Sequence, residues 1–235
     1  MKLLILAGGF GTRLQHLGFN LPKALVPVGS SPFLELQLQN WLRQGITSFV
    51  FLLHHQADRV TQYLHIAQHD LLSGCEYSIV VEKSALDTGG AIANAVKELS
   101  LTGDFLVTNA DTWLNAGIAD LQKASSPAIA VLQVAEGNRF GSVDFDDNGA
   151  ITGFREKDPF STACWISAGM YRLNAGLFAA WGGERVSIEK GLFPLLLKEK
   201  QLRAVKIQSN FIDIGVPEDY HRFCRWIQDG RSYSL

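Results

Sequence analysis

A glycine-rich loop follows the first apolar run of the chain and ends on an arginine. Gly8, Gly9 and Gly11 fall within four positions, and Thr12 and Arg13 come directly after them. Glycine lets a backbone approach a ligand closely and point N–H groups at it, which suits phosphate oxygens. The arginine adds a planar, permanently charged fork for a polyphosphate. A glycine-rich turn with a surface arginine is the structural alternative.

A lysine follows this loop on a segment bounded by two prolines. Lys23 lies between Pro22 and Pro27, ten residues after Arg13. Proline restricts its own backbone and that of the residue before it, so we expect a stiff, extended segment. A lysine on such a segment can be held against a phosphate. A solvated lysine on a rigid loop is the alternative.

The loop differs from two common phosphate-binding patterns. No Gly-Lys-Ser/Thr follows it, which excludes a P-loop. Its G-G-x-G spacing also differs from the G-x-G-x-x-G of dinucleotide-binding folds. This difference argues against a nicotinamide-dependent reductase.

The elements that must position these residues alternate between strands and helices in the first half of the chain. Apolar patterns predict strands over 2–7, 49–53, 77–81 and 105–108 and helices over 33–44, 57–67 and 90–99. This order favours parallel strands with helices on both faces, because parallel strands need long crossovers. The first half is therefore predicted to be a doubly covered parallel sheet.

The second half has a different pattern after residue 126. Strands are predicted over 128–135, 142–145, 151–155 and 166–173, then a helix near 188–199, a strand near 203–207 and a last helix from Pro217. The turn Asp147-Asn148-Gly149 predicts a hairpin, because Asn and Gly tolerate positive φ. We expect one domain over 1–235, a mixed, mostly parallel α/β sheet with antiparallel additions. The last helix has an apolar face that docks on the domain or makes a homo-oligomer contact.

The loop and the lysine segment together carry a family resemblance. G-G-x-G-T-R followed by P-K-x-L-x-P-V resembles the sugar-1-phosphate nucleotidyltransferases, which have a Rossmann-like fold. Similar motifs extend over almost the whole chain, in the segments 86–91, 109–112, 139–143, 154–157 and 211–220. The last segment is similar to the end motif of the branch that makes GDP-heptose. Ala24, Asp87 and Ala110 depart from the family pattern at flanking positions.

The resemblance implies that a sugar 1-phosphate attacks the α-phosphate of a nucleoside triphosphate and releases pyrophosphate. Positioning and charge neutralisation are the main help that such a transfer needs. Arg13, Lys23 and Asp111 are the implied catalytic residues. Arg13 would neutralise the pyrophosphate, and Lys23 would bridge the two reacting phosphates. The residues implied in nucleotide binding are Leu6, Ala7, Gly8, Gly9, Gly11, Thr12, Arg13, Lys23, Glu82, Thr88, Gly89, Gly90 and Asn109.

Magnesium is the implied cofactor, with Asp111 and Asp213 as its candidate ligands. Mg²⁺ prefers hard oxygen ligands and needs one or two carboxylates. Asp111 follows a predicted strand, and Asp213 is costly in its apolar surroundings unless paired or metal-bound. A helix N-cap at Asp111 and a turn residue at Asp213 are the alternatives. The sequence does not show whether the fold brings the two together.

Sugar and base selection are expected in different halves of the chain. The resemblance assigns the sugar phosphate to Gly141, Glu156, Lys157 and Gly169 in a sugar-binding half, 126–235, and the nucleotide to a half over 1–125. Glu82 could accept from guanine N1–H and its exocyclic amine, which favours GTP. An exposed glutamate at a strand end is the alternative. The expected pair is GTP and D-glycero-D-manno-heptose 1-phosphate.

Rival functions stay open at this point. Mannose-, N-acetylmuramate- or glucose-1-phosphate transfer with GTP, UTP, dTTP or CTP would use the same loop. A non-catalytic sugar-nucleotide sensor or regulatory subunit is the alternative of another class. Retention of the whole charged set, from Arg13 to Asp213, argues against a mere binder.

Composition excludes several other classes of protein. The chain has 235 residues, 47% hydrophobic and 19% charged, which is ordinary for a globular enzyme. A net charge of −2 gives no basic field for nucleic acid. The longest apolar runs, 3–7 and 49–53, are far shorter than the roughly 20 residues of a membrane span, and no signal peptide is expected. Three scattered cysteines favour a reducing compartment, the cytoplasm.

Overall fold

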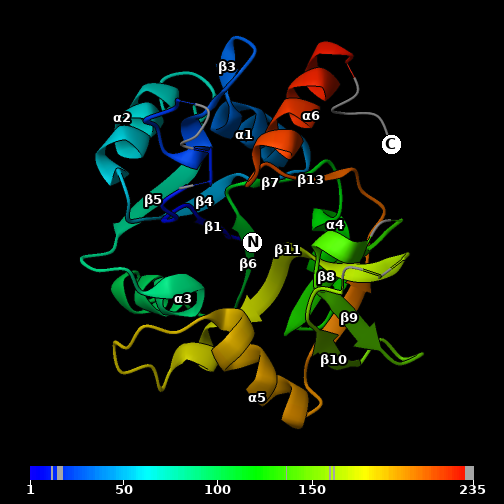
Figure 1. Cartoon of the computed structure of the whole chain (residues 1–235). Helices are drawn as coiled ribbons and strands as arrows, with labels where there is room; N and C mark the ends of the chain where they lie inside the picture. Colours follow the sequence, from blue (N-terminus) through cyan, green and yellow to red (C-terminus); the bar gives the residue numbers. More distant parts are fainter. Residues whose placement is uncertain (12, 15–17, 136, 159, 161, 231–235) are drawn as a thin grey trace.

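A mixed sheet runs through the computed structural model and has helices on both faces (Figure 1). The structure describes residues 1–11, 13–14, 18–135, 137–158, 160 and 162–230. Among these residues, nine strands form the main sheet: β1 (Leu3–Leu6), β4 (Ser48–Leu53), β5 (Glu76–Val81), β6 (Asp104–Asn109), β8 (Ala128–Val134), β9 (Ser142–Phe145), β10 (Ile151–Arg155), β11 (Cys164–Asn174) and β12 (Arg203–Lys206).

Helices and two short strand pairs complete the described fold. The α-helices are α1 (Phe33–Arg43), α2 (Ala57–Ala67), α3 (Asp87–Glu98), α4 (Ile118–Lys123), α5 (Phe193–Lys198) and α6 (Pro217–Gln228). Two small antiparallel pairs join β2 (Pro27–Val28) to β3 (Ser31–Pro32) and β7 (Thr112–Leu114) to β13 (Phe211–Asp213). A 3₁₀ turn, η2 (Lys23–Leu25), and a π-helical segment, η5 (Ile188–Leu192), also bear on the site.

The strand pairing confirms the expected change from a parallel to an antiparallel arrangement. β1 pairs in parallel with β4 and β6, and β4 pairs in parallel with β5. β11 runs antiparallel to β6 and to β8, so strands from both halves of the chain share one sheet. The assignment of nucleotide to the first half and sugar to the second stays a prediction.

Side-chain alternation along the buried strands builds a core on each face of the sheet. In β1, Leu3 and Ile5 pack with α1 and α2, whereas Leu4 packs on the opposite face with α3. Successive strand residues point to opposite faces, and a strand covered on both faces is therefore apolar throughout. This double burial explains why these strands appear in the sequence as continuous apolar runs.

The hairpin after residue 145 is confirmed, and the helix near residue 188 is more complex than expected. β9 and β10 pair antiparallel around a turn in which Gly149 has a φ of 78°. The segment 188–198 begins as the π-helical η5 and continues as α5, whose first turn holds a proline. Proline has no N–H to donate, so an α-helical hydrogen-bond pattern cannot run unbroken through this point.

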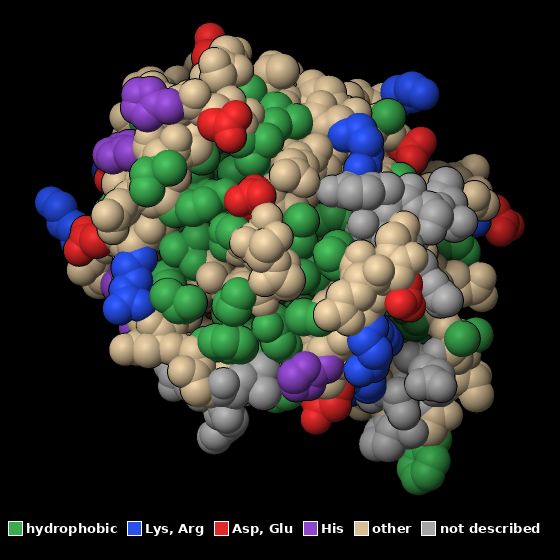
Figure 2. Space-filling view, turned by 90° about the horizontal axis from the view of Figure 1, so that it is seen from above, with side chains coloured by type: hydrophobic (Ala, Val, Ile, Leu, Met, Phe, Trp, Pro, Cys, Tyr) green, Lys and Arg blue, Asp and Glu red, His purple; other side chains and the backbone are tan. Residues whose placement is uncertain are grey.

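The face that carries α1, α2 and α6 has hydrophobic side chains gathered near its middle (Figure 2). The apolar side of α6 packs inward, with Tyr220 and Phe223 buried. Among the described residues, no helix is both long enough and apolar enough to cross a bilayer.

Candidate active site

A cavity of about 370 Å³ opens at the carboxyl ends of β1 and β6, where ligands bind in open α/β sheets. It lies between the glycine-rich loop after β1 and the start of α3. Nine of the residues expected to bind nucleotide or metal line it: Leu6, Ala7, Gly8, Gly9, Lys23, Glu82, Thr88, Asn109 and Asp111. The fold thus gathers residues spread over more than a hundred positions.

The pairing of β7 with β13 brings Asp111 and Asp213 to one place. Asp213 lies opposite Thr112 in the antiparallel register, and the Ile214 N–H donates to the Asp111 carbonyl at 2.9 Å. Asp111 comes just past the end of β6 and begins no helix, so the N-cap alternative is wrong. The question that the sequence left open is answered by these two three-residue strands.

Lys23 contacts the same group of carboxylates. Its Nζ lies 2.8 Å from Asp111 Oδ2, and both side chains are largely buried. Lys23 begins the 3₁₀ turn η2, so the expectation of an extended segment is wrong at Lys23 itself, although Pro22 and Val26 on either side of the turn are extended. A Cβ on Gly215 would lie 2.7 Å from Asp213 Oδ1 and 3.2 Å from Lys23 Nζ, which explains the glycine there.

The electrostatics of this group follow from its burial. Burial raises the pKa of the Asp213 carboxyl, and the negative charge of Asp111 raises it further. The Gly215 N–H, which donates to Asp213 Oδ1 at 2.7 Å, acts in the opposite direction. The charges of Lys23 and Arg13 also lower this pKa. Asp213 is the last residue of β13, so it is not a turn residue, and its carboxylate belongs to the charged group around Lys23.

Two buried amides on α1 hold β7 in place from the side away from β13. Gln37 Nε2 donates to the Thr112 carbonyl at 2.7 Å, and Asn40 Nδ2 donates to the Leu114 carbonyl at 2.6 Å. Both side chains are fully buried. A buried carbonyl without a hydrogen bond is costly, so these amides stabilise the strand that follows Asp111.

Glu82 lies in the wall of the cavity, and the alternative of an exposed glutamate is wrong. The residue is only 8% exposed, and its Oε2 accepts from the Leu86 N–H at 2.8 Å. Burial raises the pKa of Glu82, and the charge of Asp87 contributes to the rise, while the Leu86 N–H and His54 oppose it. The other oxygen, Oε1, would lie 3.6 Å from a Cβ built on Gly8.

Gly89 and Gly90 contact the chain itself and do not line the cavity. A Cβ on Gly89 would lie 3.0 Å from the Val186 carbonyl oxygen and 3.1 Å from the Ile188 nitrogen. The Gly90 N–H donates to the Val186 carbonyl at 3.0 Å, and the Ile188 N–H donates to Thr88 Oγ1 at 2.9 Å. We call residues 184–189 the strap, because they cross the first turn of α3 at this point.

Two glycines of the predicted sugar site lie at close backbone approaches. Gly169 has a φ of 68° at an irregularity in the pairing of β11, and a Cβ there would lie 2.8 Å from Asn109 Nδ2. The sugar-half strand β11 therefore touches the end of β6 beside the cavity. A Cβ on Gly141 would lie 2.9 Å from the Arg155 carbonyl oxygen, so this glycine permits close contact with the end of β10.

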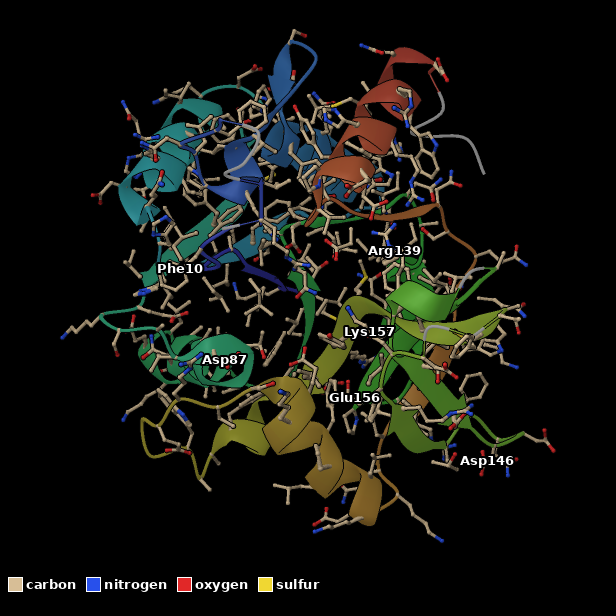
Figure 3. All side chains as sticks on the ribbon, viewed as in Figure 1. Phe10, Asp87, Arg139, Asp146, Glu156 and Lys157 are labelled. Atoms are coloured by element: carbon tan, nitrogen blue, oxygen red, sulfur yellow. The ribbon has the colours of Figure 1, made fainter. Side chains whose placement is uncertain are left out.

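The remaining predicted residues lie outside the cavity lining. Glu156 and Lys157 are exposed after β10, and Figure 3 shows them on the other side of the view from Phe10 and Asp87. Arg13 is exposed, although its charge acts on Asp213. A Cβ on Gly11 would lie 2.9 Å from Lys23 Cγ. Thr12 lies outside the described residues.

Sequence reasoning missed several residues that line the cavity. Phe10 belongs to the glycine-rich loop but carries no charge, and its ring lies edge-on to His54 with the centroids 5.8 Å apart. In the sequence, Asp87 is recognisable only as a departure from a motif. Arg185 has no recognisable motif, because the strap reaches the cavity only through the tertiary fold.

The arrangement suits the binding of an anionic ligand with a divalent cation. Lys23 meets a carboxylate pair at the cavity, and the glycine backbone, Glu82 and Asp87 belong to the same lining, with Gly8 next to Glu82. Among the described residues, no group of three or more His, Cys, Asp or Glu side chains could hold a metal. Two carboxylates suffice for Mg²⁺ when phosphate oxygens and water complete its shell.

Known proteins resemble this chain over nearly its whole length. The D-glycero-alpha-D-manno-heptose 1-phosphate guanylyltransferase of Campylobacter jejuni is 32% identical over 95% of this chain and 98% of that protein. The mannose-1-phosphate guanylyltransferase catalytic subunit beta of Danio rerio is 30% identical over 98% of this chain and 66% of that protein.

Solved structures share the fold. HddC from Yersinia pseudotuberculosis, complexed with GMP-PN, is 27% identical, with a TM-score of 0.81 over 96% of this chain and 99% of that one. A UDP-glucose pyrophosphorylase at 20% identity has a TM-score of 0.75, which shows the same Rossmann-like nucleotidyltransferase fold. The family model described as nucleotidyl transferase matches residues 2–229. The chain therefore belongs to the nucleotidyl transferase family of enzymes that act on sugar 1-phosphates, as the sequence motifs had predicted.

Proposed function

We propose that this enzyme joins GTP to D-glycero-D-manno-heptose 1-phosphate and releases pyrophosphate. An oxygen of the sugar phosphate attacks the α-phosphorus of GTP, and the bond between the α-phosphorus and the α–β bridging oxygen breaks. The observation that carries the proposal is the contact of Lys23 with Asp111, beside Asp213, at the end of the nucleotide-sized cavity. This is where two anionic reactants need opposite charge.

Each cationic residue neutralises a different part of the phosphate charge. Both reactants are anions, so their approach is repulsive until nearby positive charge offsets it. The N–H groups of Gly8 and Gly9 at the cavity are suited to the triphosphate. Lys23 bridges the α-phosphate and the incoming phosphate. Arg13 stabilises the pyrophosphate that leaves, through the fork geometry of its guanidinium.

A magnesium ion fits the donor set of the carboxylate pair. Asp111 and Asp213 would hold it, because they supply hard oxygen ligands from two adjacent chain segments. When bound, the ion supplies positive charge that stabilises charge developing on the phosphate oxygens. Lys23 contacts Asp111 at 2.8 Å and is therefore within reach of both the carboxylates and the phosphates beside them.

Glu82 supports the preference for GTP. It is a buried carboxylate in the cavity wall, and guanine offers N1–H and an exocyclic amine as neighbouring donors. The guanylyltransferase names of the relatives from Campylobacter jejuni and Danio rerio agree with this preference.

The sugar is expected over β11 and the loop after β10. Gly169 and Gly141 allow the close approaches to Asn109 and Arg155 that shape this surface. Glu156 accepts from sugar hydroxyls, and Lys157 holds the sugar phosphate. The heptose preference is supported by the end motif over 211–220 and by the coverage of the Campylobacter jejuni protein, which matches over 98% of its length.

The test is pyrophosphate release from a panel of substrates in the presence of magnesium. GTP, UTP, dTTP and CTP are each combined with heptose, mannose, N-acetylmuramate and glucose 1-phosphates. The proposal expects the highest kcat/KM with GTP and the heptose. A higher value with another pair would replace the substrate assignment, and no release from any pair would favour a sugar-nucleotide sensor.

A further inference from the structure

Asp87 occupies an unusual backbone position in the wall of the cavity. It begins α3 with a φ of 65°, a left-handed conformation that favours glycine, and the family motif commonly has glycine there. Its Oδ1 accepts from the Thr88 N–H at 2.8 Å, which holds the side chain over the turn. Glycine would suit this backbone conformation better, so the conformation does not explain the aspartate.

Asp87 and Glu82 present similar acceptors to the cavity. Glu82 uses Oε2 for the Leu86 N–H, and Asp87 uses Oδ1 for the Thr88 N–H. Among the described residues, Glu82 Oε1 receives no hydrogen bond, and Asp87 Oδ2 has only the Arg185 guanidinium, at 3.5 Å. Each carboxylate therefore keeps one oxygen that a ligand can reach from the cavity.

These two acceptors do not suit a phosphate, because two negative charges would repel it. They suit a neutral ligand edge that carries neighbouring donors. Guanine has such an edge, with N1–H beside the 2-amino group. Uracil and thymine have a single N–H between two carbonyls, and adenine and cytosine place their amine beside a ring-nitrogen acceptor.

We propose that Asp87 accepts a hydrogen bond from the 2-amino group of guanine, next to the contact that Glu82 makes with N1–H. This inference rests on the proposed GTP-dependent function and adds a specificity residue to it. Figure 3 shows Asp87 apart from Lys157, the residue proposed to hold the sugar phosphate. Arg185, 71% exposed at its side chain, offsets part of the Asp87 charge.

The test compares GTP with ITP, which lacks the 2-amino group, and with dGTP, which lacks the ribose 2′-hydroxyl. The variants are Asp87→Gly and Asp87→Asn, because glycine suits a φ of 65° and removes the carboxylate without new strain. Asp147→Asn, in the exposed β9–β10 turn, is the matched control. Each protein is measured for kcat/KM and, by calorimetry, for the Kd of each nucleotide.

We expect wild type to prefer GTP over ITP by roughly tenfold to a hundredfold, the range for a hydrogen bond to a charged group. Asp87→Gly should bring this ratio close to one by weakening GTP alone, and Asp87→Asn should lower it partly. The ratio of kcat/KM for GTP to that for dGTP should stay constant in every variant. The control should have the wild-type values of both ratios.

Two outcomes would overturn the assignment. An unchanged GTP/ITP ratio in Asp87→Gly would show that the carboxylate does not contact the base, and a lost GTP/dGTP ratio would assign it to the ribose. Binding separates this result from the proposed function. A protein that binds GTP with an Asp87-dependent preference but releases no pyrophosphate would support the base contact and contradict the enzyme reaction.

Discussion

At the scale of single residues, one ammonium group serves two carboxylates. Lys23 pairs with Asp111, and its charge also lowers the pKa of Asp213, which burial and Asp111 raise. Either carboxylate alone would leave the group with a different balance of charge. The net charge of this group, and with it the pKa of Asp213, therefore depends on both carboxylates.

Asp111→Asn should reduce turnover by about a thousandfold or more, because it replaces one of the two carboxylates proposed to hold the divalent cation with a neutral amide. Asparagine keeps the shape of the side chain, so the folded structure should persist. Pyrophosphate release gives turnover, and circular dichroism and Tm report folding. Asp120→Asn, in the exposed first turn of α4, is the control, and near-normal activity of Asp111→Asn would exclude Asp111 as a ligand.

The site residues could be predicted from the sequence, but their contacts with one another could not. The glycine-rich loop, Lys23 and both carboxylates have residue types that suit phosphate and metal, and these were recognisable without a structure. β7 and β13 have three residues each, too few for a periodic pattern, and they pair across about a hundred positions. Contacts that depend on tertiary pairing, such as Arg185 with Asp87, leave no local signal in the chain.

At the scale of elements, Gly89 and Gly9 both belong to predicted nucleotide-binding motifs, but their surroundings differ. Gly89 packs against backbone atoms of the strap, whereas a Cβ on Gly9 would meet nothing within 4 Å. Gly89 therefore serves the fit of the strap on α3. The space beside Gly9 is open, as the proposed approach of a phosphate to the loop requires.

Gly89→Ala should lower the free energy of unfolding by roughly 1–2 kcal/mol, because three close backbone contacts outweigh the gain in helix propensity. Gly9→Ala should leave it within about 0.5 kcal/mol but raise the KM for GTP, since the added methyl group occupies the phosphate approach. Urea unfolding and steady-state kinetics measure both quantities. The same loss of stability in both variants would contradict this division.

The junction of β6, β11 and α4 should give the fold part of its pH dependence. The pKa of Asp104 is lowered, first by its hydrogen bond from Asn174 and then by Arg172, whose Nη2 lies 2.7 Å away. Arg172 also donates to carbonyl groups at the end of α4. A carboxyl whose pKa is lower in the folded state stabilises the fold above its unfolded pKa, and this stabilisation is lost as the pH falls through the folded pKa.

Asp104→Asn should therefore cost about 1–3 kcal/mol at pH 7, and the difference from wild type should shrink as the pH falls below the ordinary Asp range near 4. Urea unfolding across this range measures it. Asp144→Asn is the matched control, because its partner Arg155 is exposed and such pairs contribute about 0–1 kcal/mol. A difference that does not depend on pH would assign the effect to packing alone.

At the scale of the whole molecule, the cavity lies at the carboxyl ends of β1 and β6, and β11 from the second half of the chain packs beside it. β6 supplies Asn109, and β11 places Gly169 against it. A nucleotide in the cavity would contact the loop after β1, the start of α3 and the end of β6 together. Binding should then stabilise the sheet as a unit, because a ligand that binds only the folded state shifts the unfolding equilibrium.

GTP with magnesium at a hundred times its Kd should add about 2.7 kcal/mol to the free energy of unfolding. For a chain of this length, Tm should rise by roughly 5–10 °C. Scanning calorimetry with GTP and with ATP, each in the presence and absence of magnesium, measures the rise in Tm. It separates the part that depends on magnesium from the part that depends on the base. ATP should give a smaller rise, because it lacks the donor edge that suits Glu82 and Asp87. In Asp111→Asn, the part that depends on magnesium should disappear, while the part that depends on the base should remain. An equal rise with ATP, or a magnesium effect that survives Asp111→Asn, would contradict the separation of the cavity into a base end and a phosphate end.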